Sequence, residues 1–116
     1  NNFKNLINTP QIMFKEANAK EFKEMVSEDK NAVLIDVRTA EECDGGMIPN
    51  SINIDLMSPE FMDKVLELDR YKNYYMICRS GGRSSTACGA MANNGFKSLV
   101  NLDGGMLSWD GEVVHP

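Results

Sequence analysis

The residues best suited to chemistry lie in one short loop that runs from Cys78 to Arg83. An apolar run over 74–77 precedes the loop and a helix-like stretch opens at Ser84, so the cysteine stands where the chain reverses direction. Two glycines and two arginines without an acid, leading into a helix N-terminus, can turn several backbone N–H groups toward one point that favours an anion. The simplest anion there is the sulfur of Cys78 itself, which predicts a reactive thiol.

Two properties of the loop favour the thiolate form of Cys78. A free cysteine has a pKa near ~8.5, and a helix N-terminus with a neighbouring arginine lowers it to about 3.5–7.5. Gly81 and Gly82 have no Cβ, so the backbone can approach the sulfur closely and adopt positive φ where a tight cradle needs it. Ser80 and Ser84 add hydroxyl donors, so the sequence predicts an ionised nucleophile at neutral pH.

The other cysteines and the one histidine are interpreted as structural. Three cysteines cannot all pair within one chain, and their spacing matches neither a zinc site nor a C-x-x-C redox pair. Cys88 lies among small residues of the following helix and is interpreted as core, with a resolving thiol as the alternative. Cys43 is interpreted as half-buried scaffold, with a regulatory disulfide as the alternative. His115 is expected to be a solvated tail residue, so no Cys–His dyad is predicted.

Length and charge narrow the class of protein. A chain of 116 residues with 42% hydrophobic and 25% charged residues is long enough to bury a core without disulfides. It has no apolar run near the ~20 residues that span a bilayer. The net charge is −5, yet the stretch 71–102 contains four basic residues and no acid. This pattern disfavours nucleic acid as a partner and favours a local positive focus for a small anion. We expect a monomeric, cytoplasmic protein, although an upstream export signal stays open because the sequence begins at Asn1.

Short apolar runs alternate with helical stretches, which predicts an α/β fold with a mostly parallel sheet. The expected strands are 12–15, 32–37, 51–54, 74–77 and 98–101. The expected helices are 18–26 with a capping box at Asn18, 39–42, a helix opening at Ser58-Pro59, and 84–93. We expect one domain over 1–116 with an N-terminal extension at 1–11.

The pattern also indicates what lies near the loop. Ligands of open parallel sheets bind beyond the carboxyl ends of the strands, which is where Cys78 falls. Arg38 closes the second strand and is expected to pair with Glu41 or Glu42 as a structural link. The sequence 103–105 is expected to be a turn near the same edge.

Four segments together resemble the single-domain rhodaneses, a family of sulfurtransferases. They are Asp36-Val37-Arg38 with Glu41-Glu42, the stretch 46–54, the loop from Cys78 to Ser84, and Leu102-Asp103-Gly104-Gly105 with Trp109. They occur in family order and cover nearly everything after residue 12. The chain departs from the family pattern where Met47 replaces the usual histidine, Asn50-Ser51 replaces Gly-Ala, and Cys43 replaces an aromatic residue.

The resemblance implies about five parallel strands between two helix layers, and a ping-pong reaction through a persulfide on Cys78. Thiosulfate or a similar small anionic donor would supply sulfane sulfur, and cyanide, a thiol or a protein would accept it, without a metal or organic cofactor. Cys78 and Arg83 are then the predicted catalytic residues. The predicted persulfide-binding residues are Arg79, Ser80, Gly81, Gly82 and Ser84.

Two alternatives remain open at the level of sequence. Cysteine phosphatases and arsenate reductases resemble this loop but use Cys-x5-Arg, one residue longer than the Cys-x4-Arg of Cys78 to Arg83. The shorter cradle favours sulfur over a tetrahedral oxyanion. A non-catalytic docking module of a sulfur relay is the second alternative, which the retained cysteine and arginines disfavour.

Overall fold

The sheet that carries the loop has five parallel strands. The computed structural model describes residues 14–116, and the sheet order is β1-β5-β4-β2-β3. All four strand pairs are parallel, with Leu34 opposite both Ser51 and Tyr75. The strands are β1 (Lys15–Ala17), β2 (Ala32–Asp36), β3 (Ser51–Asn53), β4 (Asn73–Ile77) and β5 (Ser98–Leu102). The predicted α/β class and parallel sheet are confirmed; of the first predicted strand, residues 12 and 13 lie outside the described residues, as does the extension 1–11.

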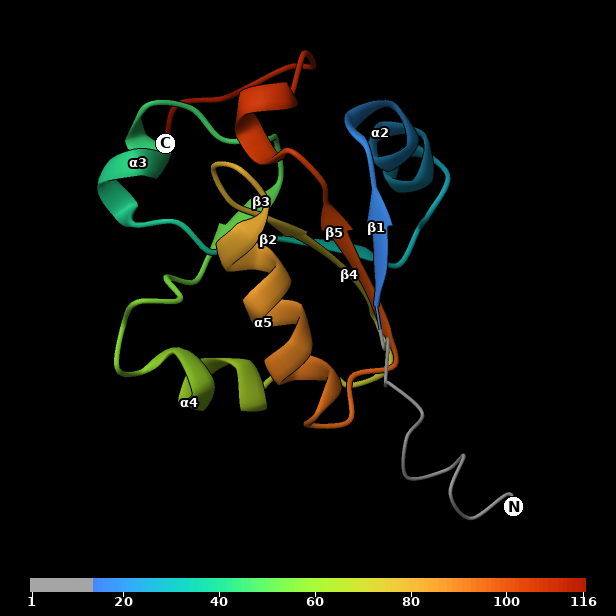
Figure 1. Cartoon of the computed structure of the whole chain (residues 1–116), viewed down its shortest axis with the longest axis vertical. Coiled ribbons are helices and arrows are strands. Elements are labelled where there is room, and N and C mark those ends of the chain that lie inside the picture. The colour runs from blue at the N-terminus through green and yellow to red at the C-terminus, as the bar shows by residue number, and fades with distance from the viewer. Residues whose placement is uncertain (1–13) are drawn as a thin grey trace.

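Helices cover both faces of this sheet (Figure 1). They are α2 (Ala19–Ser27), α3 (Ala40–Asp44), α4 (Phe61–Leu66), α5 (Gly82–Ala92) and the 3-10 turn η1 (Gly105–Ser108). Alternate residues of β4 enter two separate cores, because side chains of a strand point to opposite faces in turn. Tyr74 and Met76 pack with α4 and α5, whereas Tyr75 and Ile77 pack with α2 and η1.

Local capping signals explain two of the helix starts. The side chain of Asn18 accepts the Glu21 N–H at 2.8 Å, and the Glu21 side chain accepts the Asn18 N–H at 3.0 Å, so the predicted capping box is confirmed. Thr39 and Glu42 form the same arrangement at the start of α3. The prediction that a helix begins at Ser58 is wrong. Ser58 Oγ accepts the Glu60 N–H within a turn, and α4 starts only at Phe61.

The C-terminal segment returns to the turn that follows α3. Met47, which is buried, exchanges two backbone hydrogen bonds of 2.8 Å with Val114. Methionine therefore contributes its backbone and an apolar side chain at this turn. Within residues 14–116, no helix is both long enough and apolar enough to cross a membrane.

Candidate active site

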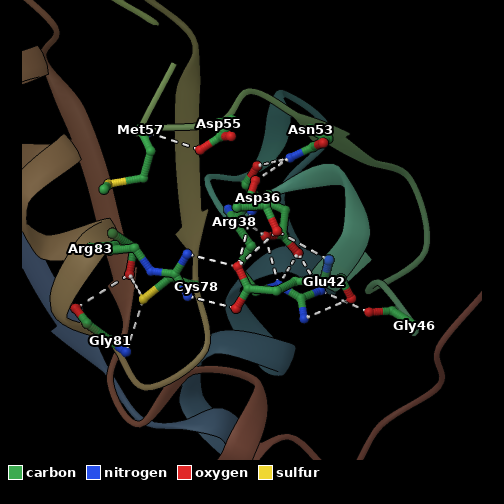
Figure 2. A network of polar contacts seen from close by, with 12 residues as sticks. Asp36, Arg38, Glu42, Gly46, Asn53, Asp55, Met57, Cys78, Gly81 and Arg83 are labelled. Atoms are coloured by element: carbon green, nitrogen blue, oxygen red, sulfur yellow. Dashed lines mark hydrogen bonds and ion pairs between the residues drawn. The ribbon is translucent and has the colours of Figure 1, made fainter. Parts of the chain in front are cut away.

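Cys78 directly follows β4, at the carboxyl edge of the sheet, and its side chain is buried. Its Sγ accepts a hydrogen bond from the Gly81 N–H at 3.0 Å (Figure 2). It accepts a second one from the Ser84 hydroxyl at 3.3 Å. The helix α5 begins at Gly82, two residues earlier than predicted, and the backbone N–H of Ser84 in its first turn also acts on the sulfur. The predicted cradle around the thiol is therefore present.

The donors around the sulfur outweigh the effect of burial on its pKa. Burial alone raises the pKa of Cys78, but the Ser84 hydroxyl and the backbone N–H groups of Ser84, Gly81 and Ser80 lower it below its ordinary value. Hydrogen bonds to the charged form stabilise a thiolate even where solvent is excluded. Cys78 therefore combines a buried sulfur with a stabilised anion, which is what a nucleophile or a persulfide carrier requires.

The two loop glycines have different roles. Gly81 has φ of 105°, and a Cβ there would lie 3.2 Å from the Gly104 nitrogen and 3.4 Å from the Leu102 oxygen. Gly82 has no positive φ, and within the described part of the chain an added Cβ there would have no neighbouring atom within 4 Å. The close approach and positive φ that the sequence allows at both glycines are therefore found at Gly81, whereas Gly82 serves as the first residue of α5.

Three backbone carbonyls of the loop are held from outside. The N–H groups of Met106 and Leu107 in η1 donate to the carbonyls of Cys78 at 2.9 Å and Arg79 at 3.0 Å. Gly105 permits this approach, since a Cβ there would collide with the Arg79 carbonyl. The predicted turn at 103–105 near the loop is confirmed.

Asn101 holds the third carbonyl and was missed by the sequence analysis. It lies on β5, is 1% exposed, and donates from Nδ2 to the Gly81 oxygen at 3.1 Å and to Glu16 Oε1 at 2.9 Å. Because Asn101 fixes the Gly81 carbonyl, it also restrains the residue whose N–H donates to the Cys78 sulfur. The feature of the sequence that could have indicated Asn101 is a single amide side chain in the middle of a largely apolar strand.

Arg83 reaches an acid from another part of the chain. Its Nη1 and Nη2 donate to Oε1 and Oε2 of Glu42, each at 2.8 Å (Figure 2). This pairing lowers the pKa of Glu42 to about 2 and raises that of Arg83. Glu42 was missed as a site residue, because nothing local in the sequence links α3 to α5.

The expected pairing of Arg38 with Glu41 or Glu42 is wrong. Arg38 instead pairs with Asp36, with Nη2 and Oδ2 2.8 Å apart and both side chains buried. The carboxylate of Asp36 is fully buried and needs a cation, which takes Arg38 away from the more exposed side chains of Glu41 and Glu42. Arg38 also donates to the Gly46 carbonyl at 2.8 Å and thereby fixes the turn after α3.

The remaining predicted residues divide between the surface and the core. Arg79 and Ser80 are exposed, and Arg79 makes no ion pair with any residue in 14–116. Cys43 and Cys88 are free and buried, and burial raises the pKa of both, to about 11 for Cys43. Cys43 is thus more buried than predicted, and the core interpretation of Cys88 is confirmed.

His115 is exposed and lies apart from the thiol. The His115 ring lies 3.3 Å from the Asp44 carbonyl and not within hydrogen-bonding distance of Cys78. In the part of the chain that the structure describes, no group of three His, Cys, Asp or Glu side chains is arranged to hold a metal ion.

Known proteins are similar to this chain in sequence and in fold. The Rhodanese-like domain profile matches residues 18–112. The Bacillus subtilis protein YtwF, provisionally named a sulfurtransferase, is 42% identical over 99 residues, which are 85% of this chain and 93% of YtwF. The thiosulfate sulfurtransferase GlpE of Pseudomonas syringae is 31% identical over 81 residues, or 70% of this chain and 74% of GlpE. A rhodanese-like domain protein from Staphylococcus aureus superposes with a TM-score of 0.78 at 31% identity, covering 89% of this chain and 99% of that one. With its five-stranded parallel sheet and its cysteine loop at the carboxyl edge, this chain belongs to the rhodanese-like domain family.

Proposed function

We propose that this chain is a sulfurtransferase that carries sulfane sulfur as a persulfide on Cys78. The observation that carries the proposal is the cradle of donors at one sulfur, with the Gly81 N–H at 3.0 Å and the Ser84 hydroxyl at 3.3 Å from Sγ. The names of its relatives YtwF and GlpE support transfer of sulfur as the general reaction. Donors placed in this way stabilise an anion on sulfur both before and after transfer.

In the first half-reaction, the Cys78 thiolate attacks the outer sulfur of thiosulfate or a related sulfane donor. A bond forms between Sγ and that outer sulfur, the S–S bond of thiosulfate breaks, and its electron pair leaves with sulfite. Negative charge moves from Sγ to the terminal sulfur of Cys78–S–S⁻, and no net oxidation or proton transfer is needed.

In the second half-reaction, a nucleophilic acceptor takes the terminal sulfur. Cyanide, a small thiolate or a protein thiolate attacks that sulfur, the persulfide S–S bond breaks, and Cys78 regains its thiolate. With cyanide the product is thiocyanate. The N–H groups of the loop, from Arg79 to Ser84, stabilise the departing Cys78 thiolate during this step.

The loop length supports sulfur rather than phosphate as the transferred group. The four residues between Cys78 and Arg83 form a cradle in which Gly81 N–H and Ser84 Oγ both converge on Sγ itself. A phosphatase cradle must instead leave its donors free for the oxygens of a bound phosphate. We assign Arg79 and Ser80, both exposed at the loop tip, to the entry of the donor.

We also propose the compartment and the oligomeric state in which this activity takes place. Three free cysteines in residues 14–116 suit a reducing compartment such as the cytoplasm. We further propose that the chain acts as a monomer, as a single rhodanese-like domain with an N-terminal extension at 1–11.

Mass spectrometry of the intact protein after thiosulfate treatment tests the function directly. We expect one added sulfur atom that reductant removes, present in the wild type, Cys43→Ser and Cys88→Ser but absent in Cys78→Ser. Added sulfur that persists in Cys78→Ser would refute the assignment of the carrier. Hydrolysis of an aryl phosphate without any persulfide would replace sulfur transfer with phosphatase chemistry.

A further inference from the structure

An ion pair between two helices lies at the end of the cysteine loop. Glu42 on α3 and Arg83 on α5 meet through two hydrogen bonds of 2.8 Å, and their side chains are 30% and 29% exposed. Glu42 is itself held from behind, because its Oε1 accepts from the Thr39 N–H at 3.1 Å and the Thr39 hydroxyl at 3.2 Å. The carboxylate is thus fixed on both sides and keeps Arg83 in one orientation.

This pair changes what Arg83 can do for a donor. A guanidinium binds an anion best when two parallel N–H groups face it, and here two such groups are occupied by Glu42. A second carboxylate, that of Asp55, also acts on Arg83. Because the charge of Arg83 is already balanced, Arg79 is the loop cation left to offset the repulsion between the Cys78 thiolate and an approaching dianion, and this repulsion grows with each charge on the donor.

The surroundings of the pair are partly apolar. Leu107 is 65% exposed and borders the loop, since its N–H donates to the Arg79 carbonyl. Met57 is 71% exposed and its N–H donates to Asp55, the second acid that acts on Arg83. Exposed apolar side chains beside the loop and the acids that act on Arg83 favour an organic ligand over a small inorganic ion.

We propose that Glu42 is a specificity-determining residue, which holds Arg83 away from the donor and thereby favours organic sulfane donors of low charge, such as persulfides and thiosulfonates, over dianionic thiosulfate. The inference rests on the proposed function, because it concerns the donor of the same Cys78 persulfide. Glu42 acts through Arg83, and so it is a positioning residue.

Two donors that differ by one charge provide the test. Thiosulfate and methanethiosulfonate both present an outer sulfur on a sulfonyl centre, but the first is a dianion and the second a monoanion. The rate of Cys78 persulfide formation is measured by rapid quench and mass spectrometry for each donor. For each protein, the rate constant with thiosulfate is divided by the rate constant with methanethiosulfonate. Comparing this ratio between a variant and the wild type cancels the intrinsic reactivity of the two donors.

Glu42→Gln is the informative variant, since glutamine can still serve the capping box with Thr39. We expect the second-order rate constant for thiosulfate to rise about tenfold and that for methanethiosulfonate by less than about threefold. Glu41→Gln is the matched control: it removes one charge from the same helix, and Glu41 is exposed and makes no ion pair in residues 14–116. Its ratio of rates should stay within about twofold of the wild type.

The outcomes separate this inference from the proposed function. Equal effects of Glu42→Gln on the two donors, or an effect matched by Glu41→Gln, would overturn the inference while persulfide formation still supported the function. Failure of both donors to modify the wild type would overturn both. If Glu42→Gln does not fold, Asp55→Asn removes the other acid that acts on Arg83 and should shift the ratio in the same direction, and an unchanged ratio there would also overturn the inference.

Discussion

Cys78 and Cys88 show how two buried cysteines acquire opposite acidities. Both side chains are almost fully buried, and burial raises the pKa of a thiol in each case. At Cys88 no hydrogen-bond donor among residues 14–116 opposes that effect. At Cys78 the hydroxyl of Ser84 and three backbone N–H groups reverse it. Reactivity in this chain therefore depends on donors aimed at the sulfur and not on exposure of the sulfur.

Ser84→Ala tests this argument at the thiol itself. Losing the hydroxyl removes one hydrogen bond to the thiolate, so the pKa of Cys78 should rise and its alkylation at pH 7 should slow about tenfold. The measurement is the pH dependence of iodoacetamide modification at Cys78, with Ser85→Ala as the control. The wild-type midpoint should lie below the free-thiol value of about 8.5, and a midpoint at or above that value would contradict a stabilised thiolate.

Arg83→Ala should lower kcat/KM for thiosulfate by about 10². The change removes a cation near the Cys78 sulfur and leaves the Glu42 carboxylate without its partner, so both effects repel an anionic donor. Adding Glu42→Gln to this variant should recover part of the loss, because the uncompensated charge is then gone. Full activity in Arg83→Ala would show that its guanidinium contributes nothing to sulfur transfer.

At the scale of elements, the loop is a short segment clamped by its neighbours. β5 holds the Gly81 carbonyl through Asn101, and η1 holds the carbonyls of Cys78 and Arg79. The helix α5 supplies donors from its first turn. The cradle therefore keeps its shape because three elements fix the backbone around it.

The two loop glycines offer a paired test of this clamp. Gly81→Ala must place a Cβ on a residue with φ of 105° and close to the Gly104 nitrogen. This strain should cost about 1–3 kcal/mol of stability. It should also displace the Gly81 N–H from the sulfur and thereby raise the pKa of Cys78. Gly82→Ala meets no neighbour and should be tolerated in both respects. Urea unfolding and the alkylation profile measure the two effects, and equal losses in both variants would argue against a specific role of Gly81.

Elements encoded by local patterns were predicted well from the sequence. The strand at 32–37 appears as β2 (Ala32–Asp36), and the capping box at Asn18 is present, because each depends on residues within a few positions. The contacts of Glu42 and Asn101 could not be predicted in this way. Glu42 lies 41 positions from Arg83, and they meet only because the sheet order brings α3 toward α5.

At the scale of the whole molecule, the charge around the Cys78 loop differs from the charge that the sequence predicts. The acid-free stretch 71–102 predicted a positive focus at the loop, but Glu42 and Asp55 reach Arg83 from outside that stretch. Arg79 is left as the loop cation without an ion pair in residues 14–116. The linear pattern thus indicated the Cys78 loop as the candidate site, whereas the electrostatic balance around that loop depends on the tertiary structure.

The ion pair also links α3 to α5, and so it should couple the stability of the molecule to pH. Folding lowers the pKa of Glu42 from 4.5 to about 2, so the unfolded chain binds the proton more readily. The stabilisation is fully present above pH 4.5 and is lost as the pH falls from there toward 2. Since the pair is partly exposed, we expect it to contribute about 1 kcal/mol or less.

Urea unfolding of the wild type and Glu42→Gln at several pH values measures this coupling. The difference in free energy of unfolding between them should be constant near neutral pH and should shrink between pH 4.5 and 2. Asp29, whose pKa is also lowered, titrates in both proteins and cancels from the difference. Glu41→Gln, which breaks no ion pair within residues 14–116, should show no comparable convergence with the wild type. Parallel stability curves for the wild type and Glu42→Gln across that range would mean that the pair closes the mouth of the loop without stabilising the fold.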